Sequence, residues 1–202
     1  MAKERLGDRF RLLIYERMWQ RWAWPCILTI LASLALWWLS PRISIIRPSL
    51  RFLTLGPALI SFVILVYAFL ARRLSWVQCR EGHLRIRTLF YPLAVSYGRI
   101  KEIRPVNFVQ IFEPAREKAA RKRWLRPYWR KTVLVVELSR YPVSQAQLRF
   151  WLSPYLLLPN KPGLVLLVKD WMTLSRQLQE FHHAWTLNRA KQRKQAFGRR
   201  LR

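Results

Sequence analysis

The segments WAWPCILTILASLALWWLS (residues 22–40) and FLTLGPALISFVILVYAFL (residues 52–70) contain no ionisable side chain. Each is 19 residues long. As an α-helix, such a segment would extend about 28 Å, close to the thickness of the hydrocarbon core of a bilayer. Tryptophan pairs stand at both ends of the first segment, as interfacial aromatic residues do. We therefore expect a two-helix transmembrane hairpin over residues 22–70.

Two other readings of these apolar segments are a pair of buried helices in a soluble core and a cleaved signal peptide. The remaining sequence is too short and too basic to enclose both helices. A signal peptide is disfavoured because the 21-residue lead contains Glu4, Asp8 and Glu16, and because the second segment follows closely. We expect Pro25 in the first turn of its helix, and Gly56-Pro57 at a bend within the second helix.

Basic residues near the ends of the two spans predict their orientation. Residues 1–21 carry six Lys or Arg, residues 71–90 carry five, and the connecting loop carries three. The terminal sides of the spans thus carry eleven basic residues, against three in the loop. Under the positive-inside rule this places both termini in the cytoplasm, which implies an integral inner (plasma) membrane protein.

The N-terminal segment 1–21 is basic and amphipathic. Its apolar residues recur at helical spacing, and they are Leu6, Phe10, Leu13, Ile14 and Met18. This pattern predicts either an interfacial helix that runs into the first span or a cytoplasmic extension of that span.

The composition limits the kinds of partner. The chain of 202 residues has a formal net charge of +27, so a polyanionic neighbour such as anionic lipid, nucleic acid or a ribosome is expected. Because 52% of the residues are hydrophobic and eleven are Trp, the charge does not belong to a disordered tail alone. The two cysteines, Cys26 and Cys79, are too few for a four-ligand zinc site, and we interpret them as small packed hydrophobes.

After residue 71 the hydrophobic pattern becomes twofold, which predicts strands. In HLRIRTLF (83–90), apolar residues alternate with Arg85 and Arg87, and Glu81-Gly82 forms a turn before it. Asp170 is expected to cap a final amphipathic helix. The other predicted strands are 75–79, 93–97, 102–112, 132–139, 147–152 and 163–168.

This order of elements resembles the bacterial PH-like domain family, which includes membrane-flanked proteins whose domain follows helical hairpins. The resemblance covers about residues 20–187. It rests on three stretches of sequence. They are REGHLRIRTLF (80–90), the YGRI turn (97–100) with the stretch GRIKEIRP (98–105), and VKDWMTLSRQLQEF (168–181), which is expected to be the closing helix.

The resemblance implies an α+β PH-like domain over residues 71–187, with about seven antiparallel strands closed by a C-terminal helix. It also implies a binding or assembly module held against the membrane, with no catalytic residues of its own.

Motifs for catalysis or cofactor binding are not recognisable in the sequence. The carboxylates after residue 70 are scattered, and His83, His182 and His183 lack the i, i+4 spacing of zinc ligands. No phosphate-binding loop, nucleophile elbow or Rossmann glycine set occurs. We therefore expect neither an enzyme nor a cofactor.

Two basic clusters are the candidate binding sites. The first is an insertion over residues 113–131, where we expect a short helix with Pro114 at its first position and Pro127 at its end. The second is the tail 188–202, expected to be disordered. The insertion residues are Arg116, Lys118, Arg121, Lys122, Arg123, Trp124, Arg126, Tyr128, Trp129, Arg130 and Lys131; the tail residues are Arg189, Lys191, Arg193, Lys194, Arg199, Arg200 and Arg202.

Three partners fit basic clusters interleaved with aromatic residues. Anionic headgroups attract Lys and Arg while aromatic side chains anchor at the interface. Single-stranded RNA or a ribosome would use stacking and phosphate contacts. Acidic subunits of a larger membrane complex are the third. The position after two membrane spans favours a non-enzymatic, membrane-anchored scaffold that engages anionic lipid and a protein partner.

Overall fold

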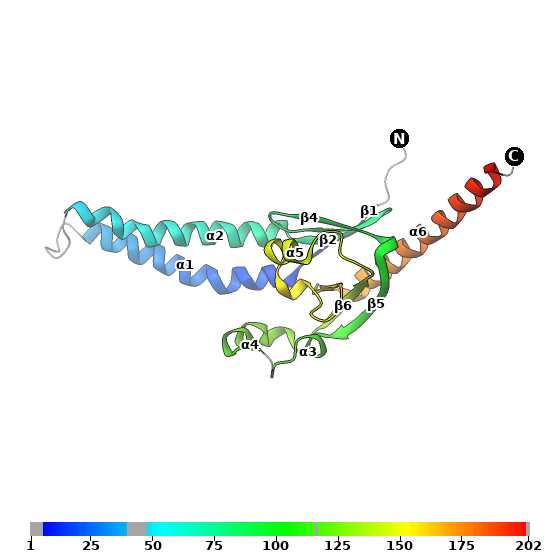
Figure 1. Ribbon diagram of the computed structural model, residues 1–202. Coiled ribbons are helices and arrows are strands. Elements are labelled where there is room, and N and C mark those ends of the chain that lie inside the picture. The colour runs from blue at the N-terminus through cyan, green and yellow to red at the C-terminus, as the bar shows by residue number, and fades with distance from the viewer. Residues whose placement is uncertain (1–5, 40–47, 116, 201–202) are drawn as a thin grey trace. The chain divides into compact units, whose positions relative to one another are not determined.

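The computed structural model describes residues 6–39, 48–115 and 117–200, and it divides the chain into two compact units (Figure 1). One unit, Leu13–Ser75, is helical. The other joins Met1–Leu12 to Trp76–Arg202 and contains the sheets. The sheet-containing domain is therefore discontinuous in sequence, which differs from the predicted domain over residues 71–187.

The helical unit consists of two long helices and a 3₁₀ segment. Helix α1 (Leu13–Leu39) is followed by η1 (Pro48–Leu55) and helix α2 (Gly56–Leu74). Both helices are long and apolar enough to cross a membrane, as predicted for the two spans.

The positions of Pro25 and Pro57 in their helices differ from those predicted. Pro25 lies inside α1, twelve residues from its start, and not in the first turn. Pro57 lies in the first turn of α2 and therefore does not bend that helix. The reason is that α1 begins nine residues earlier than the uncharged segment, whereas residues before Gly56 adopt the 3₁₀ conformation.

Helices α1 and α2 pack against each other through small side chains. An ion pair of 3.6 Å joins Glu16 to Arg72, and the rings of Trp19 and Phe69 meet edge to face, with centroids 5.5 Å apart. These contacts show that the start of α1 lies beside the end of α2. Within the apolar segments, the buried residues are Ala23, Cys26, Ser33, Ser61, Ala68 and Ala71.

Part of the N-terminal segment forms a strand, so the helix predicted for residues 1–21 is wrong for residues 6–11. From Leu13 the segment is helical and continuous with the first span, as the alternative of an extension of that span predicted. Strand β1 (Leu6–Arg11) pairs antiparallel with β2 (Trp76–Arg80), and Arg11 lies opposite Trp76. Gly7 lies at the register shift between Leu6 and Arg9, where a Cβ would lie only 3.1 Å from the carbonyl oxygen of Cys79. The helical unit is therefore an insertion between two adjacent strands.

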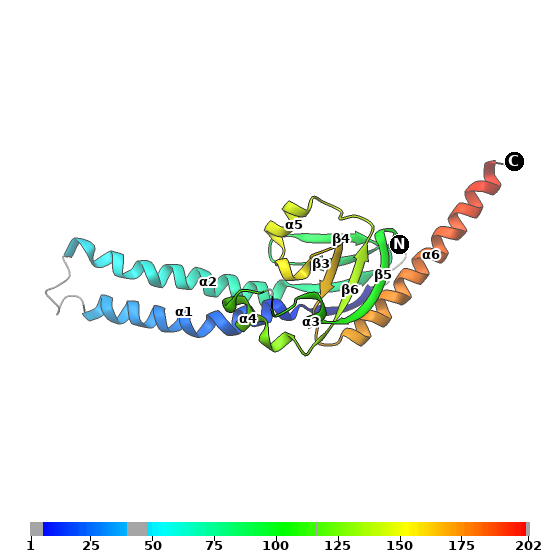
Figure 2. The same cartoon turned by 60° about the horizontal axis from the view of Figure 1, so that its bottom comes forward.

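Seven antiparallel strands form two sheets in the described part of the chain. The first sheet has the order β1-β2-β3-β4, and the second has the order β5-β6-β7. Figure 2 shows β3 and β4 crossing behind β5 and β6. The remaining strands are β3 (His83–Arg87), β4 (Pro92–Ser96), β5 (Ile100–Asn107), β6 (Thr132–Leu138) and β7 (Gly163–Leu166).

The core of the domain consists of the inward-facing side chains of the strands. In β4, buried Leu93 and Val95 alternate with exposed residues, whereas β6 is buried from Val133 to Leu138 because it is the central strand of its sheet. Glu137 in β6 pairs with Arg104 of β5 at 2.7 Å. The 3₁₀ turn η2 (Tyr97–Arg99) joins the two sheets.

Two predicted strands are wrong in whole or in part. Residues 147–152 lie in helix α5 (Gln145–Trp151), whose first turn is capped by the Ser144 hydroxyl, and not in a strand. The strand predicted over 102–112 ends at Asn107, and helix α3 (Phe108–Ile111) follows. After α5, the turn η4 (Pro154–Leu156) leads towards β7.

Helix α6 (Trp171–Arg200) packs against β2, β5 and β6. Asp170 caps it as predicted: the Thr173 hydroxyl donates to Asp170 Oδ2 at 2.6 Å and the Thr173 N–H donates to Asp170 Oδ1 at 3.1 Å. These two hydrogen bonds hold the pKa of the Asp170 carboxyl below its usual value. Leu174 and Leu178 are fully buried. The prediction of a disordered tail is wrong for residues 188–200, which continue this helix away from the sheets (Figures 1 and 2).

If β1 belongs to the domain, replacing residues 13–74 with Asn-Gly should give a folded, soluble protein, because Arg11 already lies opposite Trp76. Further deletion of residues 1–12 should lower its free energy of unfolding by about 2 kcal/mol or more, since fully buried Leu12 alone contributes about that much. Chemical denaturation measures both. Equal stability of the two proteins would show that β1 is dispensable.

Candidate functional site

The basic insertion is the connection between two paired strands. Asn107 at the end of β5 lies opposite Thr132 at the start of β6, and the Phe108 N–H donates to the Lys131 carbonyl at 3.0 Å. Both ends of the insertion are thus held together. Between them lie α3, helix α4 (Ala119–Leu125) and the 3₁₀ turn η3 (Arg126–Tyr128).

The two prolines of the insertion have different outcomes. Pro127 follows the end of α4 and begins the 3₁₀ turn, as predicted for a residue that ends the helix. Pro114 lies in a turn five residues before α4, so its predicted place at the first helical position is wrong. The helix starts only after Lys118, whose extended backbone forms the N-cap.

Contacts between aromatic rings hold the insertion against the domain. The Trp124 ring lies 5.1 Å from that of Tyr155, between ring centroids, and Tyr128 meets Phe108 edge to face at 6.2 Å. Leu125 is fully buried beside them. Burial raises the pKa of the Tyr155 hydroxyl, which is consistent with its place in this packing.

The aromatic residues predicted to contact a ligand have mainly packing roles. Tyr128 is 4% exposed, and Trp124 is half-buried. The buried Tyr128 side chain is not available to a membrane in this conformation. Trp129 is also half-buried, and its indole N–H lacks a hydrogen-bond partner.

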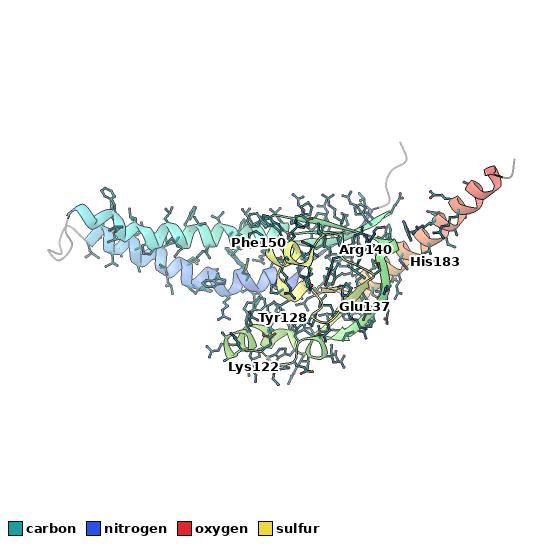
Figure 3. The ribbon with its side chains drawn as sticks, in the orientation of Figure 1. Lys122, Tyr128, Glu137, Arg140, Phe150 and His183 are labelled. Atoms are coloured by element: carbon teal, nitrogen blue, oxygen red, sulfur yellow. The ribbon has the colours of Figure 1, made fainter. Side chains whose placement is uncertain are left out.

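The basic residues of the insertion point outwards. Glu117 forms an ion pair with Arg121 at 3.9 Å across one turn, so Arg121 is partly compensated. Figure 3 shows Lys122 on α4, well apart from Arg140. Arg116 lies outside the described residues. The exposed ones are Lys118, Arg121, Lys122, Arg123, Arg126, Arg130 and Lys131.

Arg126 and Arg130 border a shallow hollow after α4. Its other walls are Pro127 and Trp129, and its volume is about 450 Å³. Guanidinium groups offer planar pairs of N–H donors that match phosphate oxygens. Two such groups beside an aromatic wall form the part of the insertion best suited to a phosphate headgroup.

The C-terminal cluster extends along α6. Arg189, Lys191 and Arg193 are exposed, and the Arg189 guanidinium lies 5.0 Å from the centre of the Trp185 ring. Trp185 itself packs on Gly98, where a Cβ would come within 2.7 Å of the indole. Lys194, Arg199 and Arg200 belong to the same helix, whereas Arg202 lies outside the described residues.

The structure also brings together an acidic groove that the sequence analysis missed. The groove lies between β1 and α6, has a volume of about 360 Å³, and includes Asp8, Glu81 and Glu180 among its lining residues. Asp8 accepts a hydrogen bond from the Gln177 side chain. These carboxylates are far apart in sequence, and only the pairing of β1 with β2 brings Asp8 near the others.

The described residues include no group of three or more His, Cys, Asp or Glu side chains placed to hold a metal ion. Cys79 is fully buried, and burial raises the pKa of its thiol to about 12. Burial likewise raises the pKa of the neighbouring Tyr97 hydroxyl. Cys79 is therefore protonated at neutral pH and behaves as a packed side chain.

Comparison of the chain with protein-family models, with curated proteins and with solved structures gives no match.

If Tyr128 holds the insertion in place, Tyr128→Ala should reduce the free energy of unfolding of the domain by about 3–5 kcal/mol, as truncation of a buried aromatic residue does. Lys122→Gln on exposed α4 is the matched control, with an expected change within about 0.5 kcal/mol. Denaturant unfolding compares the two variants in the protein whose residues 13–74 are replaced with Asn-Gly, which we call the hairpin-replaced domain. Similar effects of both substitutions would contradict the packing role.

Proposed function

We propose that this protein is a non-enzymatic scaffold anchored in the inner membrane by α1 and α2. Its PH-like domain engages anionic lipid headgroups through the basic insertion and binds a protein partner. Both termini lie in the cytoplasm. The observation that carries the proposal is the arrangement of side chains on the two apolar helices.

Within their uncharged segments, the two apolar helices expose most of their large side chains, and the residues that they bury there are small. Leu28 and Leu31 of α1 are 62% and 58% exposed, and Leu59 and Phe62 of α2 are 67% and 56% exposed. A helix pair in water would bury such residues, since each contributes about 1.5–3 kcal/mol when removed from water. Small residues between helices are typical of membrane proteins, where lipid already solvates the large ones.

The pairing of β1 with β2 supports a hairpin with both ends on one side. Arg11 and Trp76 flank the helical unit and lie opposite each other in one sheet. Two spans joined to adjacent strands must enter and leave the membrane on the same face. The eleven basic residues near these ends, against three in the connection, favour the cytoplasmic face.

The arrangement of the domain supports the PH-like interpretation in outline. Seven antiparallel strands and a C-terminal helix agree with the resemblance in the number of strands and in the closing helix, although one of the seven, β1, lies outside residues 71–187. The hairpin insertion between the first two strands is a departure from the expected order, in which the hairpin precedes the whole domain.

The charge distribution supports lipid as the ligand of the insertion. Residues 113–131 contain eight Lys or Arg against two acidic residues, Glu113 and Glu117, while Asp8, Glu81 and Glu180 lie in a separate groove. An anionic surface would attract the first region and repel the second. Each Lys or Arg near such a surface contributes about 1 kcal/mol.

Vesicle co-sedimentation of the hairpin-replaced domain tests lipid binding by the insertion. We expect preference for anionic over neutral vesicles, and we expect the triple variant Lys122→Gln, Arg126→Gln, Arg130→Gln to bind about a hundredfold more weakly at low salt. The matched control neutralises three exposed basic residues elsewhere: Lys101→Gln, Arg140→Gln, Lys169→Gln.

Equal loss in both triple variants would show a general charge effect and would contradict a lipid site on the insertion. Absence of any preference for anionic vesicles would contradict lipid binding altogether. If single-stranded RNA displaced the domain from vesicles and bound it at high salt, RNA would replace lipid as the ligand.

We assign the protein partner to the exposed residues that follow Trp185 on α6, such as Lys191. A photo-crosslinking residue at Lys191 should give a discrete cross-linked product in native membranes, whereas one at Lys101 on β5 should not. Equal products from both positions would contradict a partner site on α6.

A further inference from the structure

Four aromatic side chains form an exposed cluster outside the basic insertion. Phe90 is 61% exposed, Phe150 is 79% exposed and Trp151 is 41% exposed. The Trp151 ring lies 6.1 Å from Phe90, 6.5 Å from Tyr91 and 4.9 Å from Phe150, measured between ring centroids. We call these four residues the aromatic cluster. Figure 3 shows Phe150 at α5.

Hydrogen bonds hold the turn that presents Phe90. The Thr88 hydroxyl donates to the Tyr91 carbonyl at 2.9 Å, and the Thr88 N–H donates to the same carbonyl at 3.2 Å. Thr88 itself is buried. Phe90 is therefore displayed by a structured turn, and its exposure costs free energy unless something apolar covers it.

The strand register places this turn near the helical unit's attachment point. Trp76, the first residue of β2, lies opposite Arg87 in β3, and the turn begins at the next residue. Adjacent strands are about 5 Å apart and a chain extends at most about 3.6 Å per residue, so Phe90 lies within about 15 Å of Trp76 at any orientation of the sheet.

Helix α2 ends at Leu74, two residues before Trp76. If α2 crosses the bilayer, Arg72 and Arg73 lie at its surface, and the aromatic cluster is within reach of the headgroup region. The sequence next to the cluster carries no acidic residue: residues 83–98 and 144–158 contain no Asp or Glu, and Arg87 and Arg149 are exposed.

We propose that the aromatic cluster inserts into the headgroup region of the membrane that the hairpin spans. Aromatic rings favour this depth because they combine an apolar face with polar or polarisable edges. The contact would hold the sheet end bearing Trp76 against the bilayer. This inference rests on the proposed membrane span, and it concerns a surface separate from the basic insertion.

Spin labels on the full-length protein in vesicles with about 30% anionic lipid test this inference. Labels at Phe90→Cys and Phe150→Cys probe the cluster, and Glu81→Cys probes the turn at the opposite end of β2 and β3. Val63→Cys, 59% exposed on α2, probes the span. Buried Cys79 should not react, and the unsubstituted protein measures any background.

Relative accessibility to oxygen and to a water-soluble nickel chelate reports the depth of each label. We expect labels 90 and 150 to lie between the deep label at 63 and the aqueous label at 81, with at least a threefold lower nickel accessibility than at 81. Labels 90 and 150 as accessible to nickel as label 81 would overturn the inference while leaving the span intact.

Two other outcomes are distinguishable. An aqueous reading at residue 63 would overturn the membrane span and the inference together. Spin–spin broadening at residue 90 that disappears on dilution with unlabelled protein would show that a second copy of the chain covers the cluster, and would overturn insertion into lipid.

Discussion

Strand β1 pairs with β2 although the whole helical unit, residues 13–75, separates them. The helical unit makes this pairing possible, because the Glu16–Arg72 ion pair and the Trp19–Phe69 contact bring its two ends together. Contacts within that unit therefore offset most of the entropy that is lost when so long a segment is closed between two paired strands. In turn, the sheet keeps both ends of the hairpin on one side of any membrane that it crosses.

The same pairing organises the surfaces of the domain. It places Asp8 beside Glu81 and Glu180, which gives the strongly basic chain one acidic groove. It also makes β2 an inner strand of its sheet. On the other side of β2, Trp76 lies opposite Arg87 of β3, near the exposed turn of Phe90. The basic insertion lies in the other sheet, between β5 and β6, where neighbouring aromatic rings hold it.

Much of this arrangement could be predicted from the sequence, because burial leaves a strong pattern. The apolar spans, five of the strands and the Asp170 cap follow from uncharged runs, twofold alternation and a local hydrogen bond. The strand β1 could not, since Leu6, Phe10 and Leu13 also fit a helical stripe; Gly7, a poor helix residue, was the available signal. Helix α5 was missed because QLRFWL is short and apolar, although Ser144 offered a cap.

The basic residues of the candidate site could be predicted from the sequence, whereas the burial of its aromatic side chains could not. The exposed Lys and Arg of α4 followed from composition, whereas the contacts of Tyr128 with Phe108 and of Trp124 with Tyr155 join residues that are distant in sequence. The acidic groove and the aromatic cluster arise from contacts between separate strands and helices. Pairwise packing of this kind leaves no local pattern.

A disulfide across the hairpin tests the central claim most directly. Leu6 lies opposite Arg80, so Leu6→Cys and Arg80→Cys should cross-link under mild oxidation in native membranes. After cleavage at a protease site introduced between α1 and α2, the two fragments should migrate together until reduced. Fragments that separate without reductant would contradict the pairing of β1 with β2 around the helical unit.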